Sequence, residues 1–408
     1  MPPGIDALRH IVVLMLENRS FDHMLGCLKA KHGNIDGLNG DEAIPDSTGA
    51  MVPITQGAEF RGQLEPDPHH DFFSVDNQIF NGDMSATRQP TMDGFIRIYQ
   101  KQQQPNVAQS HNVALVFSEN GQNNLPVLHG LATQFAVFNR WFASIPGPTL
   151  CNRAFAHYGS SFGNVGMSVF YQTAKYKSIY ERLTANGRTS KLYYYDENSS
   201  TLEVVNLLQN QQVLFGTWQD FLADCDANTL PDYCFIEPNY KDHPSPDSGA
   251  MLFATDQHPD NDVRAGESFI ADVYNRIRNN PKLWPNTALL IVYDEHGGLY
   301  DHVPPPDLPP SRVDTDFIAQ PDATQTGQPF AFNRLGVRVP AILVSPWVQG
   351  GSTIDDAVFE HASIPATVTE HFMPGFNNTQ RSVREATAPT FLRYLTLNAM
   401  RTDCPDFN

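Results

Sequence analysis

Two pairs of oxygen-bearing side chains lie far apart in the chain, each directly after an apolar run. Glu17 and Asn18 follow His-Ile-Val-Val-Leu-Met-Leu, and Asp294 and Glu295 follow Ala-Leu-Leu-Ile-Val-Tyr. Ligands of open α/β sheets bind outside the carboxyl ends of the strands, so we expect the two pairs to meet at one sheet edge. Most acidic residues lie on a solvated surface, but converging carboxylates need a neutralising cation, and hard oxygen donors suit a divalent one. The pattern therefore predicts a metal site.

A hydroxyl that can act as a nucleophile follows the turn Ser-Ile-Pro-Gly-Pro. Thr149 stands at the start of a helix predicted over 150–158. A hydroxyl there is normally an N-cap, and that interpretation stays open. The same position lets backbone N–H groups and the helix dipole bind a phosphate, and coordination to a metal would activate the hydroxyl. Asn152 and Arg153 are then candidates for contacts with phosphoryl oxygens.

Histidines supply the candidates for proton transfer. His70 and His258 lie in polar loops beside acidic residues and prolines, where a histidine acts as a general acid near neutral pH or is a plain surface residue. His296 follows the second acidic pair, and it and His302 are candidates for ligands, for partners of ligands or for packing groups. His361 is expected to be structural.

The elements that must position these groups alternate between strand and helix. Apolar runs rich in branched residues are typical of strands buried on both faces of a parallel sheet. Strands are predicted over 11–16, 136–141, 192–195, 233–236, 288–293 and 339–345, and helices over 71–80, 123–135, 150–158, 267–277 and 360–372. The alternation, with no low-complexity linker, predicts one α/β domain over 1–408 with long loop insertions at about 31–68 and 300–335.

The composition of the chain limits the classes of partner that it can bind. A net charge of −18, from 27 basic and 45 acidic residues, argues against a nucleic-acid partner and against steady adhesion to anionic membranes, and leaves open a transient contact with a zwitterionic lipid surface. The apolar runs fall short of the ~20 residues of a transmembrane segment. The N-terminus lacks a basic region and an apolar region, so we expect no classical signal peptide, and a cytoplasmic protein or export by another route; a trimmed chain would look the same.

The number and spacing of the cysteines do not predict a disulfide framework. There are five of them, scattered along the chain. Free thiols are the favoured interpretation, with a Cys225–Cys234 bridge as the alternative.

With these motifs the chain resembles the bacterial and plant phosphoesterase family that holds non-specific phospholipases C and related acid phosphatases, in the alkaline-phosphatase-like superfamily. The matching segments, in the order of the family, are Glu17–His23, Asp67–His70, Met92–Phe95, Gly147–Thr149 with Asn152–Arg153, His258–Pro259 with Asp262–Val263, Asp294–Gly298 and Ser345–Trp347. The chain departs from the family at His69, where Gly or Pro is frequent, and at Cys151, where Pro is usual.

The resemblance implies a fold and a set of functions for single residues. The fold would be a doubly wound, mostly parallel α/β sheet with helices on both faces. Thr149 would attack phosphorus and form a phosphothreonine, while His70 and His258 would contact the phosphate or protonate the leaving alkoxide. Asn152, Arg153 and His296 would bind substrate. The metal would be held by Glu17, Asn18, Thr149, Asp294 and Glu295. Such an all-oxygen set favours Ca²⁺, Mg²⁺ or Mn²⁺ over Zn²⁺.

Three functions follow as hypotheses. The first is a phospholipase C that cuts glycerophospholipids to diacylglycerol and a phosphorylated headgroup. Aromatic side chains either line its lipid-accepting cleft or pack in the core: Phe72, Phe73, Phe80, Phe95 and Trp347. The second is a phosphomonoesterase of the acid-phosphatase type, with the same site in a narrower, more polar pocket. The third, which the intact set of ligands disfavours, is a non-catalytic binding protein.

Overall fold

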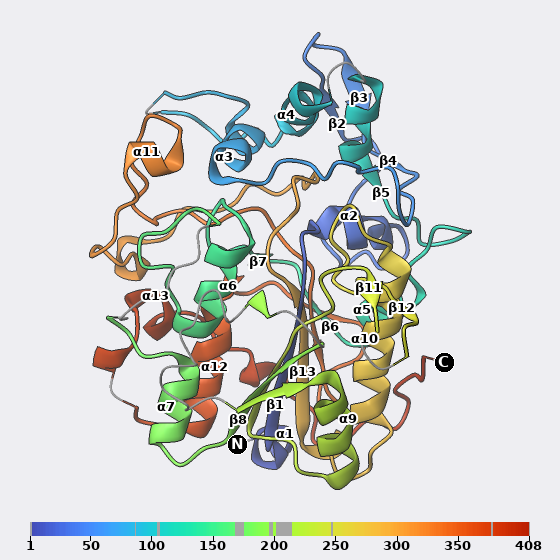
Figure 1. The fold of residues 1–408 in the computed structure, drawn as a ribbon, viewed down its shortest axis with the longest axis vertical. Helices are drawn as coiled ribbons and strands as arrows, with labels where there is room; N and C mark the ends of the chain where they lie inside the picture. Colours follow the sequence, from blue (N-terminus) through green and yellow to red (C-terminus); the bar gives the residue numbers. More distant parts are fainter. Residues whose placement is uncertain are drawn as a thin grey trace.

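An eight-stranded sheet forms the centre of the molecule (Figure 1). The computed structural model describes residues 2–407 apart from 86, 104–106, 168–174, 196–198, 201–213, 246–247 and 377. The strand order is β15-β6-β14-β13-β1-β10-β8-β9. The strands are β1 (His10–Leu16), β6 (Ala136–Phe138), β8 (Ser190–Tyr194), β9 (Leu214–Thr217), β10 (Tyr233–Ile236), β13 (Thr287–Tyr293), β14 (Ala341–Val344) and β15 (Ser352–Ile354).

Only one strand of this sheet opposes the common direction. β14 is antiparallel to both of its neighbours, β13 and β6, and the remaining pairs are parallel. The predicted mostly parallel sheet is therefore confirmed. Its carboxyl edge lies at the top of the sheet in Figure 1, where β1 leads into α2 (Phe21–Leu25).

The central pair of strands sets the level of the predicted site. β1 and β13 pair in register from His10 opposite Thr287 to Leu16 opposite Tyr293. Both strands are buried over almost their whole length, which is why their sequences are continuous apolar runs. Glu17 and Asp294 are consequently the first residues beyond the same edge.

Helices cover both faces of the sheet. In Figure 1, α6, α7 and α12 lie on one side and α5, α9 and α10 on the other. Their bounds are α5 (Pro126–Gln134), α6 (Thr149–Tyr158), α7 (Ile179–Ala185), α9 (Trp218–Ala227), α10 (Val263–Arg278) and α12 (Ser363–Phe372). In α10 an apolar stripe is buried, made of Phe269, Ile270, Val273 and Ile277. Glu267 beside it accepts the backbone N–H groups of Val127 and Leu128 at the start of α5. One buried carboxylate thus joins two helices of this layer.

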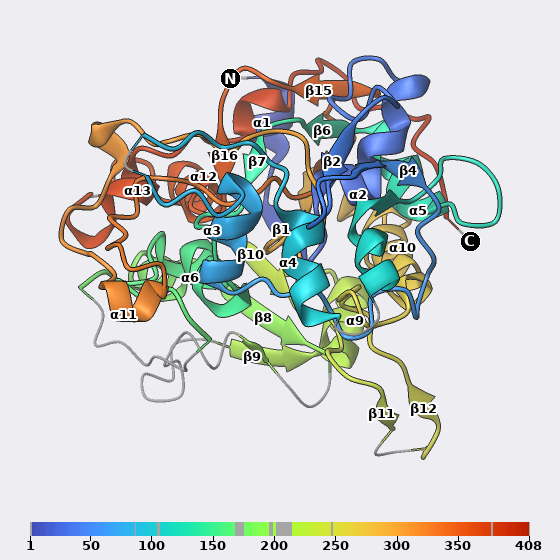
Figure 2. The ribbon, with the colours of Figure 1, turned by 90° about the horizontal axis from the view of Figure 1, so that it is seen from above.

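A smaller layer lies over the carboxyl edge (Figure 2). It has its own apolar core around Val75, Ile79 and Phe95, and it includes most of the predicted insertion at 31–68. Its elements are β2 (Ala43–Pro45), β3 (Met51–Pro53), β4 (Thr55–Gln56), α3 (Phe72–Phe80), α4 (Phe95–Gln102) and β5 (Leu115–Val116). The other short elements are α1 (Pro3–Ala7), β7 (Trp141–Phe142), β11 (His243–Pro244), β12 (Met251–Leu252), α11 (Pro321–Thr324), β16 (Phe359–Glu360) and α13 (Val383–Ala386).

Several predicted boundaries are wrong. The helix expected from residue 267 begins at Val263, and the one expected from residue 123 begins at Pro126. The strand expected over 136–141 divides into β6 and β7, because Asn139 turns the chain with side-chain bonds to the backbone of residues 34 and 36. The helix expected from Glu360 begins at Ser363, because Phe359–Glu360 pairs with β7. All five cysteines are free and buried, as the favoured interpretation had it. Within the described residues, none of the helices has both the length and the apolar character needed to span a bilayer.

Candidate active site

The two polar pairs meet at the carboxyl edge of the central strands. The backbone N–H of Asn18 donates to Asp294 Oδ1 at 3.1 Å. Asn18 has a left-handed backbone with φ of 55°, which Asn tolerates better than most residues. Gly297 has φ of 65°, and a Cβ there would lie 2.1 Å from the carbonyl oxygen of Asn18. The glycine therefore lets the loop after β13 approach the loop after β1.

Thr149 is brought to the same place by α6. Pro148 occupies the N-cap position of the helix, so Thr149 is its first residue rather than its cap. The hydroxyl of Thr149 donates to Asn18 Oδ1 at 3.2 Å. This geometry removes the N-cap interpretation and joins the ends of β1 and α6. The N–H groups of a first helical turn have no partners within the helix, so they are available to an anion beside Thr149.

Asn152 and Arg153 lie behind this surface rather than on it. Asn152 is buried and binds the preceding loop, accepting the N–H of Ile145 and donating to the carbonyl of Gly147. Arg153 is also buried, with Nε 2.9 Å from Asp294 Oδ2 and Nη2 3.3 Å from Glu17 Oε1. Asn152 is thus directed at the preceding loop and Arg153 at carboxylates, while Arg153 Nη1 is buried without a hydrogen bond.

The carboxylates are in contrasting electrostatic environments. Burial, with Asp294 nearby, raises the pKa of Glu17 well above its ordinary value against the opposing charge of Arg153. Burial likewise raises the pKa of Asp294, again against Arg153. Burial also opposes ionisation of Glu295, but His70 and His296 lower its pKa overall.

One buried carboxylate oxygen accepts no hydrogen bond. Glu295 Oε2 accepts the N–H of Gly297 at 2.8 Å, whereas the buried Oε1 has no hydrogen bond. A buried oxygen without a donor is costly, and a cation would remove that cost. The donor set therefore fits a hard divalent ion.

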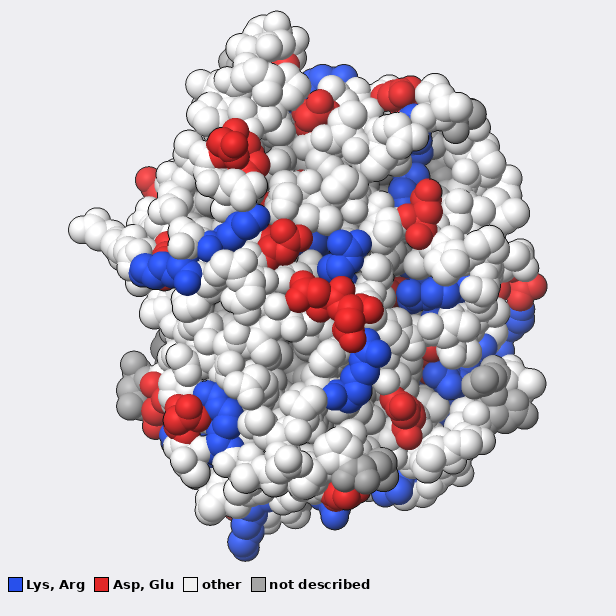
Figure 3. Space-filling view, turned by 180° about the vertical axis from the view of Figure 1, so that it is seen from behind, with Lys and Arg blue, Asp and Glu red and all other residues white. Residues whose placement is uncertain are grey.

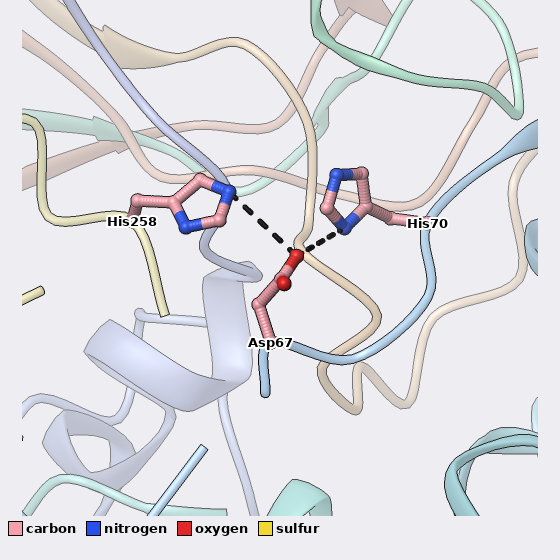
Figure 4. Close-up of side chains that lie close together, drawn as sticks. All are labelled: Asp67, His70 and His258. Atoms are coloured by element: carbon pink, nitrogen blue, oxygen red, sulfur yellow. Dashed lines mark ion pairs between the residues drawn. The ribbon is translucent and has the colours of Figure 1, made fainter. Parts of the chain in front are cut away.

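A second group faces the same space from two loops (Figure 4). Asp67 Oδ2 lies 3.5 Å from His70 Nδ1 and 3.8 Å from His258 Nε2. Figure 4 shows the carboxylate between the two rings. We call Asp67, His70 and His258 the cleft cluster. Among the described residues, two groups of three acidic or histidine side chains have ligand atoms within 4.8 Å of one another, and the cleft cluster is one of them. The three carboxylates predicted as metal ligands belong to neither group.

The two histidines of the cleft cluster differ in their anchoring. His70 Nδ1 donates to the carbonyl of Pro68, which turns Nε2 toward the amide of Asn18 at 3.4 Å and Glu295 Oε1 at 3.8 Å. His258 Nδ1 donates to Asp260 at 2.6 Å. Burial would lower the pKa of His258, but Asp260 and Glu17 raise it to about 9. His258 is thus a cation at neutral pH.

Two more histidines hold the acidic loop in place. His296 is buried and donates to Gln78 at 2.9 Å, and its other nitrogen lies 3.3 Å from Glu295. His361 donates to the backbone carbonyl of Asp294 at 2.6 Å, and burial lowers its pKa to about 4. His361 is structural, as expected. His296 lies behind Glu295 and not on the open side.

A half-open cleft of about 700 Å³ gives access to these groups. Its lining includes Glu17, Arg61, His70, Thr149, Leu150, Met167, Ser199, Ser200, Tyr240, Lys241, Asp242, Asp256, His258, Asp260 and Asn261. The five aromatic residues proposed for a lipid-accepting wall do not line it. Phe72, Phe80 and Phe95 are core residues, so the alternative interpretation of packing is correct for them.

The part of the cleft wall that follows β10 was not predicted from the sequence. Glu237 directly follows that buried strand and accepts hydrogen bonds from Tyr240 and Ser200, both of which line the cleft. Its Oε1 lies 3.8 Å from Arg153 Nη1. The signal was the same as at Glu17 and Asp294, since an acid follows an apolar run there too. Asp256, whose pKa burial raises to about 6, completes this wall.

The sequence profile of the Phosphoesterase family matches residues 8–373. This chain belongs to the phosphoesterase family. Curated relatives include non-specific phospholipase C1 of Arabidopsis thaliana, 36% identical over 98% of this chain and 73% of the relative. Phospholipase C B of Mycobacterium tuberculosis is 28% identical over 91% of this chain and 74% of its own length.

Solved structures are more distant from this member of the family. The lipoteichoic acid synthase LtaP of Listeria monocytogenes aligns with a TM-score of 0.37 and 14% identity, covering 64% of this chain and 71% of that one. A protein of the alkaline phosphatase superfamily from Vibrio parahaemolyticus aligns with a TM-score of 0.35 and 12% identity, covering 65% and 64%. As a member of the phosphoesterase family, the chain is a phosphoric ester hydrolase.

Proposed function

We propose that this phosphoesterase is a phospholipase C that uses Thr149 as its nucleophile. It would cut the bond between glycerol and phosphate and release diacylglycerol and a phosphorylated headgroup. The hydrogen bond from Thr149 to Asn18, at the floor of the cleft, is the main support for this function. The phospholipase C names of the relatives support the class of substrate.

The first step would take place on the phosphorus of the bound lipid. Thr149 Oγ forms a bond to phosphorus while its proton passes to water in the cleft, and the bond to the glycerol oxygen breaks, which produces a phosphothreonine and the glycerol alkoxide. Water then hydrolyses this ester and frees the hydroxyl. The N–H groups of the first turn of α6 lie where they can stabilise negative charge on the phosphoryl oxygens.

A divalent cation, held by Glu17, Asn18, Asp294, Glu295 and Thr149, would supply Lewis acidity and a lower pKa for the hydroxyl. Ca²⁺, Mg²⁺ or Mn²⁺ suits this oxygen-rich set better than Zn²⁺. The unpartnered Oε1 of Glu295 supports this assignment.

His258 is our candidate for the acid that protonates the leaving alkoxide. It lines the cleft and carries a proton at neutral pH, and Asp260 fixes its ring. His70 would contact the phosphate through Nε2, which its bond to Pro68 directs into the site. Asp67, between the two rings, would keep both in place.

Arg153 would act through other residues. It lies buried among Glu17, Asp294 and Glu237, and its positive charge offsets theirs. We propose that Arg153 fixes the two ligand carboxylates, in place of the substrate contact expected from the sequence. His296 would likewise position Glu295.

The test is a panel of phosphodiesters and phosphomonoesters run on the wild type and on Thr149→Ala. We expect the wild type to release phosphocholine and diacylglycerol from phosphatidylcholine, and Thr149→Ala to lose activity by at least about 10³-fold. Thr149→Ser is the matched control, since it keeps a hydroxyl. Full activity of Thr149→Ala would remove Thr149 from the mechanism, and turnover of p-nitrophenyl phosphate without any phospholipid would favour a phosphomonoesterase.

A further inference from the structure

A short hairpin projects from the body of the molecule (Figure 2). Its strands β11 and β12 are antiparallel, with His243 opposite Leu252. The residues that enter and leave the hairpin both line the cleft: Lys241 and Asp242 precede it, and Asp256 and His258 follow it. The base of the hairpin therefore lies next to the cleft.

Exposed apolar side chains lie on the second strand and directly after it. Met251 in β12 and Phe253 beyond it are each 54% exposed. Met167, which lines the cleft, is 53% exposed. Large exposed apolar side chains near a site are suited to contact with an apolar partner.

The base of the hairpin is fixed to the body. Asn239 Nδ2 donates to the carbonyl of Phe253 at 2.9 Å, and Asp242 Oδ1 accepts the N–H of Ala254 at 2.8 Å. Thr255 is bonded to Asn239 in both directions between their backbone and side-chain atoms. Met251 and Phe253 are thus presented at a set position relative to Thr149.

The charge of the molecule restricts the partner. The net charge is −18, and the face opposite the hairpin, shown in Figure 3, carries acidic and basic groups interspersed rather than one basic patch. Anionic membranes are therefore repelled overall, and binding to lipid has to come from apolar contact.

We propose that the β11–β12 hairpin docks this enzyme on zwitterionic phospholipid surfaces, by inserting Met251 and Phe253 beside the lipid that enters the cleft. The proposal rests on the proposed phospholipase C function and extends it to the way in which the substrate is reached. Insertion of these side chains removes apolar surface from water, which favours the bound state, and it brings the cleft mouth to the headgroup layer.

The experiment compares M251S/F253S with the wild type on lipid in two physical states. In the Thr149→Ala background, we expect the double substitution to weaken co-sedimentation with phosphatidylcholine vesicles by about tenfold or more. In the active background, we expect a similar loss of rate on those vesicles. The rate on dihexanoyl phosphatidylcholine below its micelle concentration should stay within about twofold, because the cleft is untouched.

Met400→Ser is the matched control. Met400 is 40% exposed, and the backbone N–H of the next residue donates to Pro346, beyond β14 at the opposite edge of the sheet. It should leave vesicle binding unchanged. If M251S/F253S binds vesicles and hydrolyses them as the wild type does, the docking proposal is overturned and the proposed function is not. The same holds if the double substitution removes a self-associated form in light scattering but leaves vesicle binding unchanged. Failure of the wild type to cleave phosphatidylcholine in either state would overturn the proposed function, and the docking proposal with it.

Discussion

Two groups of acids and histidines lie at the carboxyl edge of the same sheet, and they differ in what neutralises them. The cleft cluster of Asp67, His70 and His258 is half-buried and joined by ion pairs of 3.5 and 3.8 Å. The other group consists of Asp22, Asp301 and His302, and Arg338 lies among them. We call these four residues the arginine cluster.

The arginine cluster is satisfied by the protein itself. Arg338 Nε lies 2.9 Å from Asp301 Oδ1, and its Nη2 lies 3.2 Å from Asp22 Oδ1. His302 donates to Asp22 at 2.6 Å. Arg338, Asp22 and Asp301 are fully buried. Acids and histidines therefore serve two purposes in this protein. In the arginine cluster they bind a buried guanidinium and hold loops together. In the cleft cluster they line an open cleft, next to a Glu295 oxygen that accepts no hydrogen bond, and can act on a ligand.

Removal of the acid from the cleft cluster should lower the rate more than any change in the arginine cluster. For His258→Gln we expect hydrolysis to fall by about 10²–10⁴-fold, because the leaving alkoxide loses its proton donor. The free energy of unfolding should change by less than about 1 kcal/mol, since the side chain is partly exposed. Steady-state kinetics and thermal unfolding test this, and a variant that is unstable but fully active per folded molecule would contradict it.

The opposite result is expected for the arginine cluster. Arg338→Met leaves Asp22 and Asp301 buried without their cation, so the free energy of unfolding should fall by about 3–5 kcal/mol. The rate per folded molecule should stay within about threefold. Arg338→Lys, which keeps the charge but not the planar fork, should lie between the two. Denaturant titration measures the stability, and wild-type stability of Arg338→Met would remove the contrast.

Metal binding should separate the two groups directly. A divalent ion at about 100 times its dissociation constant should stabilise the wild type by about 2.7 kcal/mol, and prolonged chelation should abolish activity. Glu295→Gln should lose most of this stabilisation, because it removes the charge of the carboxylate whose oxygen has no partner. Asp22→Asn, in the arginine cluster, should show the same metal-dependent shift in melting temperature as the wild type. Equal responses of the two variants would argue against the ligand assignment.

The smallest expected effect is a dependence of stability on pH. Burial would lower the pKa of His302, but Asp22 and Asp36 raise it to about 10 in the folded chain. The folded state therefore holds this proton more tightly than the unfolded state, whose pKa is about 6.5. Its contribution should be complete below pH 6.5 and lost as the pH rises through 10. We expect about 1 kcal/mol, given the solvent around the ring, and a flatter profile in His302→Gln.

The buried strands and the meeting point of the site were predictable because both depend on local sequence. β10 has the predicted bounds, and β1 and β13 differ from prediction by one residue each at their first end. Glu17 and Asp294 follow from the rule that parallel strands end at one edge. The direction of β14 was not predictable, since an apolar run reads the same in either direction.

The functions of side chains that face inward were harder to predict. Arg153 stands beside Asn152 in a motif that suggested a phosphate contact, yet helical geometry points it at Glu17 and Asp294. The partnership of Asp22 with Arg338 joins residues 316 positions apart, and nothing in either local pattern announces it. Such pairs depend on tertiary packing, which a single sequence does not display.

The central position of β1 bears on how the chain is made. β1 is made before both of its partners in the sheet, residues 233–236 and 287–293. A nascent chain must therefore leave one edge of this apolar strand unpaired until residue 236 has been made, and the other edge until residue 293 has been made. Fragments that end before β13 should consequently be prone to aggregation, and they should be devoid of hydrolytic activity because they lack Asp294 and Glu295.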